Sequence, residues 1–539
     1  MVDRDQSQIA TVDEAGLLQR RVIERGDTTY RIVSKNISEY HFIVPFNLSG
    51  EELVEVGQIF SIKDKGMTYL ARVLNIEHSS NYDGHWDTTI KGTDFFDSDQ
   101  IFNRIIAEPL VCVSKDRKPT KPRTLPTKFS TVARAEIEEF NFLSQVMGDI
   151  EIGFLRNGSR LVEEIPVALH SEAMDHHMGV FATTGMGKSN FMKVFAASCM
   201  RLAARGESKF GLLIVDPHGE YLKGKPNRES IKANDQEKGL AHLRRYRDGL
   251  ACYSTDRQNA SDPGVEELAI GIKDIEPSDV ELYFDWTAAQ KDALEAIPRI
   301  FSRDWLSEIQ APESMAKLLS ENVFESTAGK ISQRIKNLLA KNKYINNIRS
   351  SIPNILSNLQ EGKVVLVDIP RMNDRSELFL LSVLSRCILD SYKEEAKSDR
   401  KNCLITIEEA QRVLGAGSNT SRFESIAREG RKFGVGLCAI TQQPKLIDKQ
   451  LLSQFNTLVV MGLGDRNDRR QLEESAKQDL SSMDIEIQTL EKGEAVVSTL
   501  DIPFPVPACI HRYEDYLRRL EKEEPERTAR KGGFKPFRE

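Results

Sequence analysis

The sequence predicts a mixed α/β fold that is preceded by a small β-barrel and interrupted by a helical insertion. Three observations favour this arrangement. Short apolar runs alternate with helical patterns in two parts of the chain, around residues 178–221 and 361–500. Short strands of alternating polarity dominate residues 14–112, and long helical patterns separate the two α/β parts. At 539 residues the chain is too long for one core, so roughly two to four domains are expected.

The composition is that of an ordinary soluble globular protein. Charged residues make up 29% of the chain, and no apolar stretch approaches the length of a membrane span. The first residues, MVDRDQSQIATVDEAG, are polar and acidic, unlike a secretory signal. The seven cysteines are scattered singly and include no C-x-x-C pair. We therefore expect a cytoplasmic protein without disulfides, structural zinc or a membrane partner.

Period-two alternation predicts the small barrel over residues 1–113. Its short strands read TYRIVS, YHFIVPF, QIFSIKD and TYLARVLNI, with turns at Gly57 and at Lys65-Gly66. Residues 114–130 follow as a linker, because SKDRKPTKPRTLPTK holds three prolines and six basic residues against one acid. This linker is predicted to be a solvated hinge, or alternatively a basic arm that touches DNA phosphate.

A phosphate-binding loop is the central motif of the chain. A short apolar run ending at Ala182 enters the loop ATTGMGKS, which fits the Walker A pattern with Ala instead of Gly at its first position. Gly185 and Gly187 permit backbone angles that turn successive N–H groups onto phosphates. Lys188 can reach the β- and γ-phosphates, and Ser189 can offer its hydroxyl to Mg²⁺. The alternative is a glycine turn with a chance GKS, but the flanking strand and helix favour nucleotide binding.

Two further stretches belong to the first part of the predicted core, residues 131–221. A helix is expected within residues 131–150, at ARAEIEEFNFLSQV, followed by the hairpin-like turn GFLRNGSRL. After the phosphate loop, GLLIVDPHGEY predicts a parallel strand that is buried on both faces. Asp216, His218 and Glu220 would then lie at its carboxyl end, where α/β sheets bind ligands. Alternatively, Asp216 begins an Asp-Pro turn with local caps.

An acidic pair marks the second part of the core. Residues 222–360 lack strand–helix rhythm and are predicted to be a helical insertion, and the rhythm returns over 361–500 with the strand KVVLVDIP. The strand in NCLITIEEAQRVL then ends in Glu408 and Glu409. The first acid can hold Mg²⁺ through water, and the second can orient and polarise the attacking water. Alternatively, the two acids are simply exposed to solvent, as acidic pairs at strand ends commonly are. Asp is more usual than Glu at position 408.

Two arginines follow on a helix predicted over residues 418–433. Glu424 lies four residues before Arg428, so those two side chains can pair. Arg431 has no acidic partner at the equivalent offsets. It is therefore either a solvated arginine or an arginine finger that enters the ATP site of the next subunit.

The last strands of the core follow that helix. The strand in VGLCAITQQP ends in Thr441 and Gln442, which would stand beside the γ-phosphate and sense its loss. TLVVMGL and EAVVST complete the sheet, and residues 501–539 are expected to end in a mobile charged tail.

Several of these motifs agree with one family. The barrel, ATTGMGKSN, VDPHGEY, IEEAQ, AREGRKFGVG and TQQP, in that order, resemble HerA, a hexameric DNA translocase of the HerA/FtsK branch of P-loop ATPases. The resemblance covers roughly residues 14–515. It implies a HAS-barrel, a RecA-like core with a helical-bundle insertion, and a C-terminal brace on a neighbour. It also implies a homo-hexameric ring that moves along double-stranded DNA with ATP.

The resemblance extends to partners and site residues. Archaeal relatives pair with the nuclease NurA in resection of broken DNA ends, and bacterial ones pair with other effectors in phage defence. The catalytic residues it implies are Glu409, Arg431, Gln442 and Lys188, with Arg428 as an alternative finger. The nucleotide-binding residues are Thr183, Thr184, Gly185, Met186, Gly187, Lys188, Ser189, Asn190, Asp216 and Glu220, and Ser189 and Glu408 hold Mg²⁺. Glu408 and Gln443 depart from the commoner Asp and Arg, and the second change bears on a contact to a neighbour.

Rival functions stay open at this point. One is an FtsK-like or conjugation-type DNA pump, against which the lack of a membrane span and the N-terminal barrel count. Another is an ATP-binding ring scaffold that assembles and regulates an effector with little translocation. The net charge of −7 disfavours a simple DNA-binding module but allows a ring with a basic inner wall. Kinase chemistry is disfavoured because no acceptor-binding motif is visible.

Overall fold

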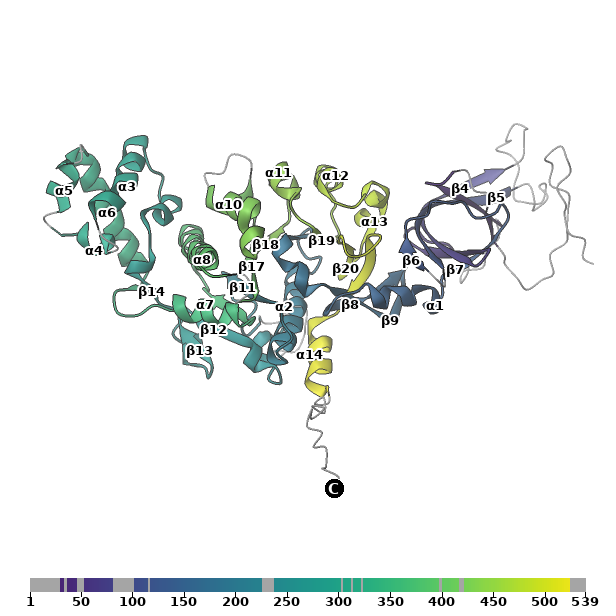
Figure 1. Cartoon of the computed structure of the whole chain (residues 1–539), viewed down its shortest axis with the longest axis horizontal. Coiled ribbons are helices and arrows are strands. Elements are labelled where there is room, and N and C mark those ends of the chain that lie inside the picture. Colours follow the sequence, from purple (N-terminus) through teal and green to yellow (C-terminus); the bar gives the residue numbers. More distant parts are fainter. Residues whose placement is uncertain are drawn as a thin grey trace, which may run out of the picture. The chain divides into compact units, whose positions relative to one another are not determined.

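The computed structural model divides the chain into two compact units (Figure 1). Unit 1 comprises residues up to Phe142 together with Asn157–Arg160, and unit 2 comprises Leu143–Arg156 and the chain from Leu161 onward. The structure describes residues 30–32, 36–45, 53–80, 101–114, 117–224, 237–301, 304–311, 314–320, 323–396, 400–415 and 421–523. The polar N-terminal stretch and the predicted tail beyond residue 523 lie outside these residues.

Unit 1 is a small closed barrel. Its strands are β1 (Tyr30–Ile32), β2 (Tyr40–Pro45), β3 (Ile59–Asp64), β4 (Met67–Ser80), β5 (Ile101–Ser114), β6 (Arg117–Thr120) and β7 (Thr131–Arg134). They pair in the order β2-β1-β7-β3-β4-β5, and β2 also pairs with β5, which closes the ring. Alternate side chains such as Phe42, Phe60 and Ile105 are fully buried inside it, as the period-two pattern requires.

The barrel takes up more of the chain than the sequence predicts. Strand β7 pairs with β1 and β3, so residues expected to begin the core close the barrel instead. Within the stretch expected to be a linker, β6 pairs with β5. The helix expected within residues 131–150 shrinks to α1 (Ile137–Phe140) and a 3₁₀ turn at Asn141–Gln145. The physical reason is that Val132 points into the barrel core, which fixes its neighbours as a strand.

A twelve-stranded sheet forms the centre of unit 2. Its strands are β8 (Ile150–Asn157), β9 (Arg160–Leu169), β10 (Met178–Phe181), β11 (Phe210–Asp216), β12 (Leu250–Ser254), β13 (Val265–Glu267), β16 (Val364–Asp368), β17 (Asn402–Ile407), β18 (Val435–Thr441), β19 (Thr457–Met461), β20 (Glu494–Ser498) and β21 (Val506–Ile510). The order is β13-β12-β16-β11-β17-β18-β10-β19-β20-β21-β8-β9. Neighbours are parallel from β13 to β19 and antiparallel from β19 to β8.

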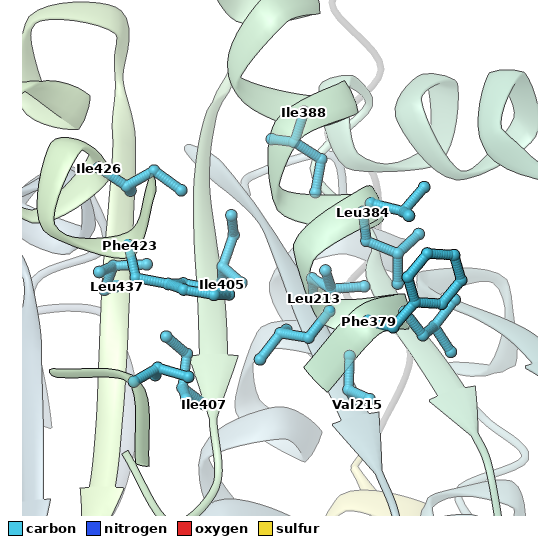
Figure 2. Packing of buried hydrophobic residues seen from close by; sticks show 14 of the residues in the cluster. Leu213, Val215, Phe379, Leu384, Ile388, Ile405, Ile407, Phe423, Ile426 and Leu437 are labelled. Carbon is cyan, nitrogen blue, oxygen red and sulfur yellow. The ribbon is translucent and has the colours of Figure 1, made fainter. Parts of the chain in front are cut away.

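Helices cover this sheet. They include α2 (Lys188–Ala204), α7 (Ile352–Gln360), α8 (Asp374–Glu394), α9 (Gln411–Leu414), α10 (Ser421–Glu429), α11 (Lys449–Leu452), α12 (Arg466–Ser475), α13 (Asp484–Thr489) and α14 (Tyr513–Lys522). Figure 2 shows Phe379 and Leu384 of α8 packed toward β11, and Phe423 of α10 packed toward β17 and β18. The central strands are buried along their whole length, because the packed helices exclude water from both faces of the sheet.

The helical insertion is shorter than residues 222–360. The helices α3 (Ala288–Ile300), α4 (Trp305–Glu308), α5 (Ser314–Ser320) and α6 (Glu325–Lys341) stand beside a two-stranded ladder of β14 (Ile270–Gly271) and β15 (Ile345–Asn346). Strands β12 and β13 and helix α7 pack with the main sheet, because the run LACYS in β12 pairs with β16. Likewise, β21 of the expected C-terminal brace is a strand of that sheet. No described helix is both long enough and apolar enough to cross a lipid bilayer.

Candidate nucleotide-binding site

The carboxyl ends of the parallel strands bring the predicted site residues to one edge of the sheet. Strand β18 lies between β10, which leads into the phosphate loop, and β17, which ends before Glu408. Adjacent strands are about 4.8 Å apart, so β10 and β17 are separated by about 10 Å. Phe181 of β10 stands in register with Thr441 of β18. The end of β18 therefore faces both the phosphate loop and the acidic pair.

The phosphate loop has the backbone that its glycines predict. Gly185 has φ 86° and Gly187 has φ 109°, and Gly187 is the N-cap of α2. A Cβ atom added at Gly185 would meet nothing within 4 Å, so the loop leaves open space there. The Lys188 ammonium donates a 2.8 Å hydrogen bond to the Ala182 carbonyl oxygen. Burial lowers the pKa of Lys188, whereas the nearby Glu409 and Glu408 act to raise it.

Glu408 is held by a residue from the neighbouring strand end. The Tyr221 hydroxyl, which is buried, donates a 2.7 Å hydrogen bond to Glu408 Oε1. Burial raises the pKa of Glu408 to about 7, and the carboxylates of Asp216, Glu220 and Glu409 add to that shift. The hydrogen bond from Tyr221 opposes it, since it favours the charged form. A cation bound beside Glu408 would favour its charged form and so oppose this rise in pKa.

Glu409 lies at the centre of a hydrogen-bond network. Its φ of 47° is in the left-handed region, which is rare for a residue with a side chain and is often found at functional sites. Gln411 Nε2 donates to Glu409 Oε2 at 2.7 Å, and Gln442 Nε2 donates to Glu409 Oε1 at 3.3 Å. The Thr184 hydroxyl in turn donates to Gln442 Oε1. The phosphate loop, β18 and β17 are thus joined by side chains that converge on one carboxylate.

Two of the residues expected to contact the nucleotide form hydrogen bonds with other parts of the chain. Asn190 bonds backbone of the C-terminal segment: its amide donates to the His511 carbonyl oxygen at 2.8 Å and accepts from the Tyr513 N–H at 2.9 Å. Asp216 accepts backbone N–H bonds from His218 and Tyr221, at 3.1 and 2.8 Å. Asp216 thus caps the turn, and its contact with the nucleotide stays a prediction.

Asp216 and the phosphate loop lie on strands that are not neighbours in the sheet. Asp216 ends β11, three strands from β10 and so roughly 14 Å away. Glu220 follows in the same turn, and its charge helps to raise the pKa of Glu408. The Met186 side chain packs against Gly462, because a Cβ atom added there would lie 2.4 Å from the Met186 Cε.

The two candidate finger arginines lie at the opposite edge of the sheet. Arg431 is in the 3₁₀ turn Gly430–Phe433 that precedes β18, and Arg428 is in the last turn of α10. Both side chains are exposed, and neither makes a hydrogen bond or ion pair with any residue that the structure describes. The expected Glu424–Arg428 pair does not form among these residues. Strand β18 spans seven residues, or roughly 23 Å, which separates Arg431 from its own phosphate loop.

The site contains two residues whose roles sequence reasoning missed, Tyr221 and Gln411. Both stood inside quoted motifs, VDPHGEY and IEEAQ. Their roles depend on partners from other strands, so spacing along the chain contained no signal for them.

The donors of the site suit a nucleotide with a divalent cation. The loop offers the start of α2 and the ammonium group of Lys188 to phosphate. Ser189 in the first turn of α2 and the carboxylate of Glu408 are hard oxygen ligands of the kind that Mg²⁺ prefers.

Several known proteins are similar to this chain. The family model described as the central domain of helicase HerA matches residues 150–388. The DNA double-strand break repair helicase HerA of Saccharolobus solfataricus is 26% identical over 413 residues, which cover 73% of this chain and 75% of that protein. The helicase of the same name from Sulfurisphaera tokodaii is 27% identical over 423 residues, covering 75% and 77%. Among solved structures, the bacterial conjugative coupling protein TrwB matches with a TM-score of 0.42 and 16% identity, covering 64% of this chain and 86% of that chain.

The sheet order, the phosphate loop after β10 and the acidic pair after β17 define a P-loop ATPase fold. Within that class, the chain is similar to the HerA helicases, through the family model over residues 150–388 and the relatives of that name.

Proposed function

We propose that the protein hydrolyses ATP to move along and unwind double-stranded DNA, as a hexameric ring. One observation carries the hydrolytic part of the proposal: hydrogen bonds lead from Thr184 in the phosphate loop through Gln442 to Glu409. Such a path suits a site in which the state of the γ-phosphate controls the residue that activates water. The relatives named as DNA double-strand break repair helicases support DNA as the substrate.

In the proposed reaction, Glu409 accepts a proton from a water molecule whose oxygen attacks the γ-phosphorus. The bond from that phosphorus to the bridging oxygen breaks, and ADP leaves with the electron pair. Lys188 and the loop N–H groups stabilise the charge on the phosphate oxygens. Ser189 and Glu408 would hold Mg²⁺, which supplies further positive charge to the phosphates when it is bound.

We propose that Arg431 acts on the ATP of another copy of the chain. Two observations support this: the guanidinium is exposed, and the length of β18 separates it from its own phosphate loop. A finger supplied in trans also explains why ATP turnover would require a ring. Arg428, one helical turn earlier, is the alternative finger.

The remaining assignments are proposals of the same kind. Unit 1 is assigned as a HAS-type barrel, and α3–α6 as the helical-bundle insertion of a RecA-like core. A nuclease similar to NurA, or a bacterial defence effector, would receive the DNA. We place the protein in the cytoplasm, which fits its seven free thiols.

The test is the rate of ATP hydrolysis with and without long duplex DNA. Wild type should be stimulated by the duplex, and less so as salt rises, because phosphate contacts are electrostatic. Glu409→Gln should no longer hydrolyse ATP but should still bind it. Arg431→Ala should hydrolyse ATP more slowly than wild type, by roughly 10³-fold or more. Arg428→Ala is the matched control that decides between the two fingers. A rate of ATP hydrolysis that does not change when duplex DNA is added would favour the scaffold function instead.

Mixing the two inactive variants tests whether the site is shared. A site in an Arg431→Ala subunit retains Glu409, and a neighbouring Glu409→Gln subunit retains Arg431. In an equimolar mixture, about one interface in four then contains both Glu409 and Arg431. The rate of ATP hydrolysis should accordingly rise to about a quarter of the wild-type rate. Two inactive variants that stay inactive together, although they assemble into mixed rings, contradict the finger in trans.

A further inference from the structure

We infer that Gln411 is a positioning residue that aligns Glu409 with the end of β18. This inference rests on the proposed function, in which Glu409 activates water. Gln411 is the first residue of α9, two positions after Glu409, and its side chain is partly buried. No role follows from its place in the IEEAQ motif alone.

Both ends of the Gln411 amide are engaged. Its Nε2 donates to Glu409 Oε2 at 2.7 Å, and its Oε1 accepts from the Thr441 hydroxyl at 2.6 Å. Thr441 is fully buried and is the last residue of β18. Its hydroxyl oxygen also accepts the Gln443 N–H at 3.0 Å, which fixes the hydroxyl proton toward Gln411. These bonds leave the amide only one orientation, with its N–H toward Glu409.

The network gives each carboxylate oxygen of Glu409 its own amide donor. Gln442 binds Oε1 and Gln411 binds Oε2, and both connect to neighbouring residues at the end of β18. Glu409 needs such support because its φ of 47° is a strained conformation for a non-glycine residue. When Gln442 changes partner, the Thr441–Gln411 arm still holds Oε2 and so keeps the carboxylate directed at the site.

Gln411→Met tests this, because it preserves the size of the side chain and removes both hydrogen bonds. We expect the turnover rate to fall about 10²-fold, as misplacement of a catalytic group by about 1 Å does. The dissociation constant of a non-hydrolysable ATP analogue should change less than twofold, since Gln411 does not contact the phosphate loop. Gln454→Met is the matched control, because Gln454 is exposed and precedes β19 at the opposite edge of the sheet.

The double variant Glu409→Gln/Gln411→Met distinguishes positioning from a structural role. If Gln411 acts through Glu409, the double variant should be no slower than Glu409→Gln alone. An additive loss, a matching loss of nucleotide affinity, or full activity of Gln411→Met would each overturn the inference. Should Glu409→Gln itself hydrolyse ATP at the wild-type rate, the proposed function fails instead, so the two failures are distinguishable.

Discussion

His177, directly before β10, is a buried histidine held neutral by its surroundings. Its Nδ1 accepts the Leu437 N–H at 3.0 Å, so the ring bears its proton on the other nitrogen. Burial lowers the pKa of His177 to about 4, and the charges of His176 and Arg431 act in the same direction. The unfolded chain, with a histidine pKa near 6.5, therefore binds more protons than the folded chain between about pH 6.5 and pH 4.

This pKa shift predicts acid destabilisation in a defined window. The stability that neutral His177 contributes is fully present above pH 6.5 and is lost as the pH falls toward 4. Between pH 7.5 and 5, wild type should lose about 2 kcal/mol more free energy of unfolding than His177→Asn, which cannot titrate there. Urea denaturation at the two pH values measures this difference. Equal losses in both proteins would contradict the assignment.

At the residue scale, sequence reasoning identified chemistry that is local to a motif. Gly185, Gly187 and Lys188 adopt the predicted loop because its conformation depends on neighbours in the chain. The bonds of the Asn190 amide to backbone more than 300 positions away could not be read from the motif, and its contact with the nucleotide stays a prediction. Gln411 was missed for the same reason, because its second partner comes from another strand.

At the element scale, the P-loop helix α2 is bound along its length to the C-terminal segment. Asn190 near its start bonds the backbone at His511 and Tyr513, and Ser198 in its middle shares a 2.7 Å hydrogen bond with the Tyr516 hydroxyl. At its end, Arg201 forms an ion pair with Glu523 at 3.2 Å. The described part of the expected brace thus lies on its own chain.

Removing one of these bonds should destabilise unit 2 measurably. Tyr516→Phe should cost about 1 kcal/mol in the free energy of unfolding, because a buried hydrogen bond is lost. Tyr344→Phe is the control, since the Tyr344 hydroxyl is also buried but has no hydrogen-bond partner in the part of the chain that the structure describes. The control should be neutral or slightly stabilised in the same denaturation experiment. Equal costs for both variants would refute this account of α14.

Elements were predictable where the chain itself is strongly patterned. The fully apolar strands β11, β16 and β18 were all expected. Strands β12, β13 and β21 were missed because they are short or partly polar, and only pairing with an existing sheet stabilises them. Pairing partners and their order are set by tertiary contacts that no local pattern contains.

At the scale of the whole molecule, each unit has its own hydrophobic core, and two unfolding transitions are expected. The barrel core includes Phe42 and Phe60, and the sheet of unit 2 is packed by a separate cluster. Phe42→Ala leaves a cavity in the barrel, so it should lower the free energy of unfolding in the barrel's own transition by about 3–5 kcal/mol. A non-hydrolysable ATP analogue should raise the midpoint temperature of the unit 2 transition and leave that of the barrel unchanged. Calorimetry checks both, and a single transition shifted by both changes would show that the units unfold together.

The position of β10 also affects how the protein is made. Its two neighbours, β18 and β19, begin at Val435 and Thr457, more than 250 residues further along the chain. During synthesis at the ribosome, the nucleotide loop therefore emerges long before the strands that support it. The barrel, whose last strand ends at Arg134, can be complete by then. Nascent chains that stop short of residue 457 should accordingly contain a folded barrel and no competent ATP site.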